Sequence, residues 1–400
     1  MSHADREQAR RLEATLRIGQ PSLDDANRAG CPDMSRNPHM IVEVTVERFR
    51  GIRQLRVQDL GRVSLIVGKN DCGKTAFMEA VEIAVSLRAA PTMLMSQQLS
   101  RMGSAFGDPA NFDRVWSPIF WNHEQETGAS IGITRDDGPA SKIELRAPPP
   151  RGEIVISPHE ESTSRGKMRL HAGEELLATK AWTLEFHTSM DGKDETFTLT
   201  SSASGLKFPH EPTGKVLWVR PSPVISYVEI QHASIIKPGE REPELLDILR
   251  TVDERVSGIE LLAPDGKTAE LFVRLERGAR PLPLTMMGEG FQRCFKISSA
   301  IVAGGAPLIF IDGIDNGLHH LAIESLWRWL AAISARRNLQ IFATTHSEEC
   351  IEAACQAFTA RNDNGLRVVR LDRHADHTSA AVYDRSLVET AIDASIEIRG

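Results

Sequence analysis

The stretch that most constrains the fold is GKNDCGKT, residues 68–75, which directly follows the apolar run VSLIV of residues 63–67. Its spacing is that of the phosphate-binding P-loop, G-x-x-x-x-G-K-[ST]. A short run that is apolar throughout is typical of a parallel strand covered on both faces. Residues 77–85 then place apolar side chains at helical spacing. A strand, a glycine loop and a helix in this order predict a nucleotide-binding α/β domain.

The residues of this loop each have a chemical reason to be there. Successive backbone N–H groups and the positive end of the following helix surround the phosphates, and glycine permits the close turns. We expect Lys74 to reach the β- and γ-phosphates and the Thr75 hydroxyl to bind Mg²⁺. Cys72 is interpreted as a passive loop residue rather than a redox sensor. The expected nucleotide-binding residues here are Gly68, Lys69, Asn70, Asp71, Cys72, Gly73, Lys74, Thr75 and Ala76.

A second nucleotide motif is PLIFIDGID, residues 307–315. Four apolar residues predict a buried strand, and Asp312 follows at its end, where a carboxylate can hold Mg²⁺. The alternative is an ordinary strand that ends in a helix-capping aspartate. The sequence ATTHSEE places His346 after a later strand, where an imidazole can bond a γ-phosphate or the attacking water. The alternative for His346 is a purely structural role.

Between these motifs, Gly288, Glu289 and Gly290 form a small turn before a predicted helix. We call these three residues the GEG turn. The N–H groups at the start of a helix are unpaired and favour anions, so the turn is a candidate γ-phosphate ligand. The alternative is a plain connection from loop to helix.

Bulk properties exclude some classes of protein. A net charge of -7 gives no global reason to expect nucleic acid. No apolar run reaches the roughly 18 residues that suggest a membrane span, and the charged N-terminus is unlike a secretory signal. Five cysteines without framework spacing fit reduced thiols. These observations predict a cytoplasmic protein.

The chain divides into segments of different character. Residues 1–38 predict an N-terminal extension, either a loosely attached helix plus linker or a disordered tail. Residues 39–400 predict a single unit made of a P-loop lobe (39–110), a β-rich insert lobe (111–225) and a lobe with the GEG turn, the metal strand and His346 (226–400).

Short alternating runs predict the strands of this unit. IVEVTVERF and IRQLRV predict a pair at the start. IGITRDD, KIELRA, EIVISP, WTLEFHT and ETFTLTS predict an antiparallel lobe that ends with KVLWVRP. ELLDILRTVDERVSGIELL predicts a helix that runs into a strand. PLIFID, LQIFATT, LRVVRL and AAVYD alternate with helices, which is typical of an α/β sheet.

These elements in this order resemble the ABC-type ATPase head shared by recombination and chromosome-maintenance proteins. Most of all, they resemble AAA-family ATP-binding proteins related to the overcoming-lysogenization-defect (OLD) group, which are associated with phage defence. The resemblance covers about residues 40–385 as order and pattern. It rests on VERFRGIRQLRVQDLGRVSLIVGKNDCGKTAFMEAV, MGEGFQR, LIFIDGIDNGLHH and IFATTHSEE.

The resemblance implies an α/β P-loop NTPase fold with a mixed sheet and an inserted antiparallel lobe. It also implies a homodimer in which two heads enclose two ATP molecules with Mg²⁺. Each nucleotide would lie on the P-loop of one head and be closed by the GEG turn of the other. Asp312 would support Mg²⁺, His346 would be the switch histidine, and Gln231 in ISYVEIQHAS would sense the metal.

Two departures from the family pattern matter. Met286 and Met287 stand where the turn usually has a serine, so Thr285 or backbone N–H groups are expected to serve. Gly313 stands where most heads have the glutamate that orients the attacking water. We expect Asp315 or His346 to position water less efficiently, so ATP binding is firm and hydrolysis slow.

The sequence therefore predicts an ATPase switch that controls a separate effector, such as a nuclease, in anti-phage defence or DNA maintenance. One alternative is an ATP-binding scaffold with little hydrolysis. Another is a DNA-repair ATPase whose groove gathers Arg48, Arg50 and Arg53. The subunit of a membrane transporter is disfavoured by the FRGI start and the MGEG turn. Asp372, His374, Asp376 and His377 are expected in a loop rather than a metal site, and His319 and His320 at a helix start.

Overall fold

The structure is a computed structural model, and much of the chain is described in it. The described residues are 40–102, 112–149 apart from 137 and 139, 154–156, 178–180, 182–222 apart from 203–204 and 209–215, and 225–399 apart from 239, 279 and 376. The predicted N-terminal extension, residues 1–38, lies outside them, as does much of the segment from 150 to 181.

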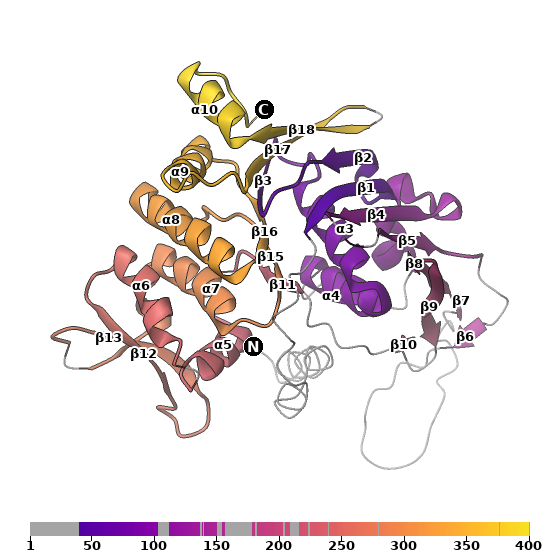
Figure 1. Cartoon of the computed structure of the whole chain (residues 1–400). Coiled ribbons are helices and arrows are strands. Elements are labelled where there is room, and N and C mark those ends of the chain that lie inside the picture. Colours follow the sequence, from indigo (N-terminus) through magenta and orange to yellow (C-terminus); the bar gives the residue numbers. More distant parts are fainter. Residues whose placement is uncertain are drawn as a thin grey trace, which may run out of the picture.

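A six-stranded sheet forms the centre of the molecule (Figure 1). Its strand order is β11-β15-β16-β3-β17-β18, and all neighbours are parallel except β17 and β18. The P-loop strand β3 lies between β16 and β17, and all five of its residues are buried. The strands are β3 (Val63–Val67), β11 (Val216–Val219), β15 (Leu308–Ile311), β16 (Gln340–Thr344), β17 (Leu366–Arg373) and β18 (Thr378–Asp384).

The two faces of this sheet pack into two separate cores. Val63, Leu65 and Val67 of β3 face one core, whereas Ile66 faces the other. The first core is covered by α5 (Tyr227–Ile236), α6 (Glu242–Val252), α7 (Glu289–Ala303), α8 (His320–Arg337) and α9 (Glu348–Thr359). The short helix α10 (Arg385–Asp393) follows β18. Burial on both faces explains why these strands read as apolar runs.

The second core lies between the parallel sheet and a seven-stranded antiparallel sheet, with α3 (Lys74–Ser86) inside it and α4 (Ala90–Met102) beside it. The strand order is β10-β9-β8-β5-β4-β1-β2. The strands are β1 (Ile41–Phe49), β2 (Ile52–Gln58), β4 (Ala129–Arg135), β5 (Ser141–Arg146), β8 (Thr183–Met190), β9 (Lys193–Ser202) and β10 (Gly205–Lys207). The N-terminal hairpin is thus one sheet with the insert strands, through pairing of β1 with β4.

Smaller elements complete the described part of the chain. β12 (Val256–Leu262), β13 (Glu270–Leu275) and β14 (Leu282–Pro283) form a three-stranded sheet, and β6 (Ile154–Ile156) pairs with β7 (Ala178–Lys180). Short 3₁₀ or π turns are η2 (Leu87–Ala89), η4 (Phe112–Trp116), η5 (Ser117–Ile119), η6 (Trp121–His123), η7 (Gln125–Thr127) and η8 (Leu284–Met286).

The predicted α/β P-loop fold is confirmed: a mostly parallel central sheet with one antiparallel pair lies beside an antiparallel sheet, and the glycine loop joins β3 to α3. One strand differs from the expectation. KVLWVRP does not end the antiparallel lobe, because β11 pairs in parallel with β15 at the edge of the central sheet. Its local pattern fits either sheet, and only the long-range pairing decides.

Candidate nucleotide-binding site

The loop from Gly68 to Gly73 connects β3 to the start of α3 at Lys74. Gly68 has a φ of +137° and Gly73 a φ of +103°. A Cβ at Gly68 would lie 2.4 Å from the carbonyl oxygen of Leu371, so both backbone conformation and space require glycine there. The loop therefore lies where the sequence predicts it, at the carboxyl end of a buried strand and the N-terminus of a helix.

Lys74 is buried at the base of this loop. Its Nζ donates hydrogen bonds of 2.8 Å to the carbonyl oxygens of Gly68 and Lys69. Burial lowers the pKa of Lys74, and the nearby Cys72, Asp312 and Asp71 oppose that effect. Burial likewise raises the pKa of the Cys72 thiol. A thiol held protonated is a poor nucleophile, which agrees with a passive role for Cys72.

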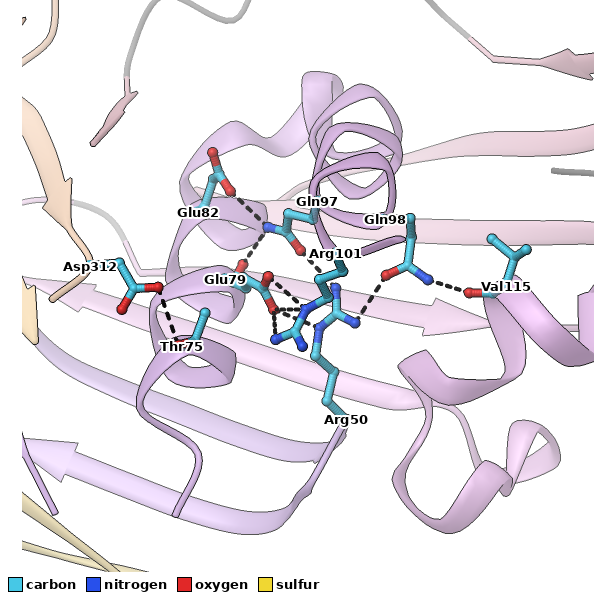
Figure 2. Close-up of polar contacts among 9 residues, drawn as sticks. All are labelled: Arg50, Thr75, Glu79, Glu82, Gln97, Gln98, Arg101, Val115 and Asp312. Carbon is cyan, nitrogen blue, oxygen red and sulfur yellow. Dashed lines mark hydrogen bonds and ion pairs between the residues drawn. The ribbon is translucent and has the colours of Figure 1, made fainter. Parts of the chain in front are cut away.

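Thr75 and Asp312 meet across the sheet edge, 237 residues apart in sequence (Figure 2). Thr75 Oγ1 lies 3.4 Å from Asp312 Oδ2. Mg²⁺ prefers oxygen ligands and takes one or two from protein beside those of phosphates, so this hydroxyl and carboxylate fit the ion. Asp312 caps no helix, because the next helix, α8, begins only at His320.

Thr344, at the end of β16, orients Asp312 and was not singled out from the sequence. Its Oγ1 donates to Asp312 Oδ1 at 2.7 Å and accepts from the backbone N–H of Gly313 at 2.7 Å. β16 lies between β15 and β3 in the sheet, so its end reaches the gap between Asp312 and Thr75. Only the strand order reveals this role.

His346 follows Thr344 by two residues, and its side chain is exposed. Partial desolvation of its ring and then the positive charge of Lys74 lower the pKa of His346, whereas the charges of Asp315 and Asp312 oppose that shift. These electrostatic neighbours show that the four residues share one end of the sheet. Asp315 Oδ1 is buried without a hydrogen-bond partner, so it is an acceptor available to a group that enters the site.

The backbone conformation at position 313 explains why glycine stands where most heads have a glutamate. Its φ is +61°, and a Cβ there would lie 2.3 Å from Nδ2 of Asn316. A residue with a side chain would be strained at this φ, and the exposed side chain of Asn316 would have to move aside.

The GEG turn is an uncapped helix start. Gly288 occupies the N-cap position of α7 without a side-chain hydrogen bond, and Glu289 and the adjacent Met286 are exposed. A Cβ at Gly290 would lie 2.9 Å from the carbonyl oxygen of Gly317, so the turn packs against the loop after Asp312. Within the described residues, no hydrogen bond joins the GEG turn to the P-loop of the same chain.

The remaining candidates lie apart from this group. Gln231 lies in α5, and no hydrogen bond or ion pair of the described residues links it to Thr75 or Asp312. His319 precedes α8 and its ring lies 4.0 Å from that of His320. Asp372 lies in strand β17 and not in the predicted loop, His374 and His377 lie in the turn between β17 and β18, and Asp376 is outside the described residues. No group of three or more potential metal-binding side chains occurs in the described part of the chain.

A buried charge cluster lies behind the P-loop helix (Figure 2). Glu79 of α3 is fully buried and forms ion pairs with Arg50, at the β1–β2 turn, and Arg101 of α4. Gln97 Nε2 donates to Glu82 Oε2 at 2.8 Å. Burial raises the pKa of Glu82 to about 7. Through these contacts, helix α3, which begins with Lys74 and Thr75, is bonded to the β1–β2 turn of the antiparallel sheet and to α4.

Comparisons with known proteins agree with a nucleotide-binding domain. A family model described as "AAA domain, putative AbiEii toxin, Type IV TA system" matches residues 225–352, less than half of the chain. The chain is 22% identical over 343 residues to the "ATP/GTP phosphatase" of Helicobacter pylori, which covers 81% of this chain and 90% of that protein. It is 24% identical over 100 residues to uncharacterized protein MJECL10 of Methanocaldococcus jannaschii, over 24% of this chain and 43% of that protein.

Solved structures give a more distant likeness. The Smc head bound to the C-terminal winged-helix domain of ScpA has a TM-score of 0.46 at 9% identity, and 87% of this chain and 98% of that chain are covered. The Smc head with an extended coiled coil, bound to a domain of ScpA from Pyrococcus furiosus, has a TM-score of 0.47 at 9% identity, with 91% and 100% covered.

No helix in the described part of the chain combines the length and apolarity that crossing a membrane requires. The P-loop between β3 and α3, with Asp312 beside Thr75, makes this an ATPase-type P-loop domain, similar to a protein named ATP/GTP phosphatase.

Proposed function

We propose that this chain is a slow Mg²⁺-dependent ATPase that dimerises around ATP and acts as a switch for a separate effector. The observation that carries the proposal is the meeting of Lys74, Thr75 and Asp312 at one edge of the central sheet. The three come from two distant parts of the sequence, and their side chains are an ammonium, a hydroxyl and a carboxylate. Together with the amides of the glycine loop, they suit a nucleoside triphosphate.

The chain's own groups account for binding. Lys74 Nζ already lies among the loop carbonyls of Gly68 and Lys69, so a short movement of the side chain offers its charge to phosphate oxygens. Thr344 holds the Asp312 carboxylate toward Thr75. When bound, Mg²⁺ would offset negative charge on the phosphates and orient their oxygens.

Hydrolysis is proposed to be slow because the usual carboxylate is missing. A group that positions or deprotonates the nucleophile contributes typically about 10²- to 10⁴-fold in rate. Gly313 cannot supply it. Asp315, with a buried oxygen that has no partner, and His346, kept neutral by its lowered pKa, are the proposed groups that position water.

Dimerisation and effector control extend the proposal. The uncapped start of α7 has no hydrogen bond to its own P-loop in the described residues, which leaves it free to meet a nucleotide on a second copy. The resemblance to the OLD group, and the family name that mentions a putative toxin, support a role in defence with an effector such as a nuclease. The name ATP/GTP phosphatase of a relative supports hydrolysis and adds GTP as a candidate substrate.

The second candidate is an ATP-binding scaffold without useful turnover. It is favoured by the left-handed φ of Gly313, which disfavours any residue with a side chain at the usual position of the glutamate. The structure weakens the alternative of a DNA-repair ATPase. Arg50, one of the three arginines expected in a DNA-binding groove, is buried and forms an ion pair with Glu79.

The test is Mg²⁺-dependent phosphate release from ATP and from GTP by the purified chain, beside direct nucleotide binding. Lys74→Ala is expected to lose binding and turnover. Lys267→Ala is the control, since this lysine is exposed between β12 and β13, outside the glycine loop. Turnover that disappears with Lys74 supports the ATPase, and binding without turnover supports the scaffold. A parent chain that binds neither nucleotide would contradict both.

A further inference from the structure

Arg293 lies in the second turn of α7 and is only 6% exposed. Its Nη2 donates to the carbonyl oxygens of Asp312 at 2.7 Å and Gly313 at 2.9 Å, and its Nη1 donates to the carbonyl oxygen of Arg220 at 3.2 Å. One guanidinium therefore joins α7 to the ends of two neighbouring strands, β15 and β11.

This arginine is a buried cation whose hydrogen bonds go to main-chain carbonyl groups. Burial lowers the pKa of Arg293 to about 10, and the charges of Asp312 and Asp315 oppose that effect. The guanidinium is therefore charged at neutral pH. Burying a charge costs free energy unless hydrogen bonds compensate. If this position only needed its space filled, an apolar side chain would avoid that cost.

Two of the three carbonyl groups that Arg293 binds, those of Asp312 and Gly313, belong to the turn that aims the Asp312 carboxylate. Thr344 holds the same turn from the opposite side, through the Gly313 N–H and Asp312 Oδ1. Gly313 has a left-handed φ of +61°, so this turn needs external contacts to keep one conformation. The planar fork of arginine reaches several acceptors at fixed angles, which a lysine cannot do.

We propose that Arg293 is a positioning residue that holds the Asp312–Gly313 turn in the geometry that accepts Mg²⁺ beside bound nucleotide. Arg293 is on α7, the helix that begins at the GEG turn. Its hydrogen bonds therefore connect the backbone of Asp312 to the helix that carries the GEG turn. This inference rests on the proposed function. It concerns a residue outside the P-loop, the metal strand and the GEG turn.

The test measures nucleotide binding rather than turnover. A fluorescent ATP analogue is titrated onto the parent chain, Arg293→Lys and Arg293→Met at increasing Mg²⁺. Groups that orient a metal ligand typically change metal affinity by about 10- to 100-fold, so we expect the half-saturating Mg²⁺ concentration to rise by that factor in both variants. Binding of the analogue without Mg²⁺ should stay unchanged.

Arg241→Lys is the matched control. Arg241 Nη1 donates to the carbonyl oxygens of Val302 and Ala303 at the far end of α7, so its replacement tests the loss of a similar arginine contact away from the site. It should leave the Mg²⁺ dependence as in the parent chain. If Arg293→Met does not fold, as judged by circular dichroism, Arg293→Lys decides.

The outcomes distinguish a failure of the proposed role of Arg293 from a failure of the proposed function. A parent chain that binds the analogue with Mg²⁺, together with an Arg293→Lys variant of unchanged Mg²⁺ dependence, overturns the role of Arg293 and leaves the proposed function intact. An equal change in Arg293→Lys and Arg241→Lys overturns it too, because the effect would be one of helix stability. A parent chain that binds no nucleotide overturns the proposed function and this inference with it.

Discussion

At Gly313 the backbone conformation, more than the absent carboxylate, decides what the position can hold. The left-handed φ costs a residue with a side chain roughly 1–2 kcal/mol, and Asn316 blocks the Cβ direction. The departure from the family pattern is therefore built into the turn that carries Asp312. Simple restoration of glutamate should not restore a fast enzyme.

Gly313→Glu tests this. We expect it to lower the free energy of unfolding by more than the roughly 1–2 kcal/mol of conformational strain, because Asn316 must also move, and not to increase phosphate release. Urea unfolding and phosphate release are the measurements. Gly266→Glu is the control, since Gly266 has a similar φ of +67° with no atom within 4 Å of its Cβ position. Faster phosphate release from Gly313→Glu would contradict the argument.

The pH dependence of turnover tests His346. Its pKa is lowered from 6.5, first by partial desolvation of the ring and then by Lys74, so the ring takes up a proton at a lower pH than a free imidazole. If the neutral ring positions water, phosphate release should fall on the acid side with a midpoint below pH 6.5. His346→Gln, which keeps a neutral hydrogen-bonding group, should remove that acid limb. An acid limb at or above pH 6.5 would argue against the assignment.

Several site residues could be found from the sequence, and others could not. Lys74, Thr75 and Asp312 stand in motifs whose spacing reflects local strand–loop–helix geometry. Thr344 and Arg293 act through contacts that depend on strand order and on helix packing, which no local spacing encodes. The assignment of Gln231 stays a prediction, since no described contact connects α5 to the site.

Helix α3 contributes to both the site and the core. Its first turn faces the candidate nucleotide site, and its middle forms buried ion pairs. Arg50 lies at the turn between β1 and β2, and Arg101 on α4, and both pair with Glu79 (Figure 2). Removing one partner of a buried ion pair typically costs about 3–5 kcal/mol. The P-loop helix is thus held by the antiparallel sheet as well as by the central sheet.

Glu82, in the same cluster, makes stability depend on pH. Burial raises its pKa from 4.5 to about 7, so the folded chain holds this proton more tightly than the unfolded chain. The resulting stability is present below pH 4.5 and is lost as the pH rises through about 7. Glu82→Gln, which keeps an acceptor for Gln97, should raise the free energy of unfolding at pH 8 by about 1–3 kcal/mol, and change it little at pH 4.5.

Urea unfolding at the two pH values is the measurement. Glu43→Gln is a control of opposite sign, because hydrogen bonds from Arg56 and Gln58 lower the pKa of Glu43. It should make the chain less stable at pH 8. A Glu82→Gln variant that is equally stable to the parent at pH 8 would show that folding does not raise the pKa of Glu82.

Element types were predictable, whereas their partners were not. The period-two pattern identified β1, helical spacing identified α3, and short apolar runs identified β3 and β15, because each pattern reflects burial along its own segment. The pairing of β1 with β4, and the place of β11 beside β15, involve residues far apart in sequence. Hydrophobic patterns say which face of a strand is buried but not against which neighbour.

For the whole molecule, the proposal places nucleotide between two copies of the chain. The exposed surface beside the GEG turn includes Met286, which is 76% exposed. An apolar side chain of that exposure is available to a second copy without any rearrangement of the first. The predicted homodimer and its ATP dependence can be tested at this residue.

Met286→Glu should abolish ATP-dependent dimerisation, because it places a carboxylate in the proposed interface near phosphate. The measurement is analytical ultracentrifugation of the parent chain and each variant, with and without ATP and Mg²⁺. Leu262→Glu is the control, since Leu262 is an exposed apolar residue at the end of β12. We expect nucleotide-induced mass doubling in the parent and control only. Doubling that persists in Met286→Glu would place the interface elsewhere.

The strand order also has a consequence for biosynthesis. β3 pairs with β16 and β17, and both are made long after it. At about 5–20 residues per second, the 237 residues between Thr75 and Asp312 take roughly 10–50 s to translate. During that time the P-loop has no metal carboxylate, and its strand has no neighbour on either side. The nascent chain must therefore shelter an apolar strand until β16 and β17 have been synthesised, and the proposed metal carboxylate reaches the P-loop only after β15 has been made.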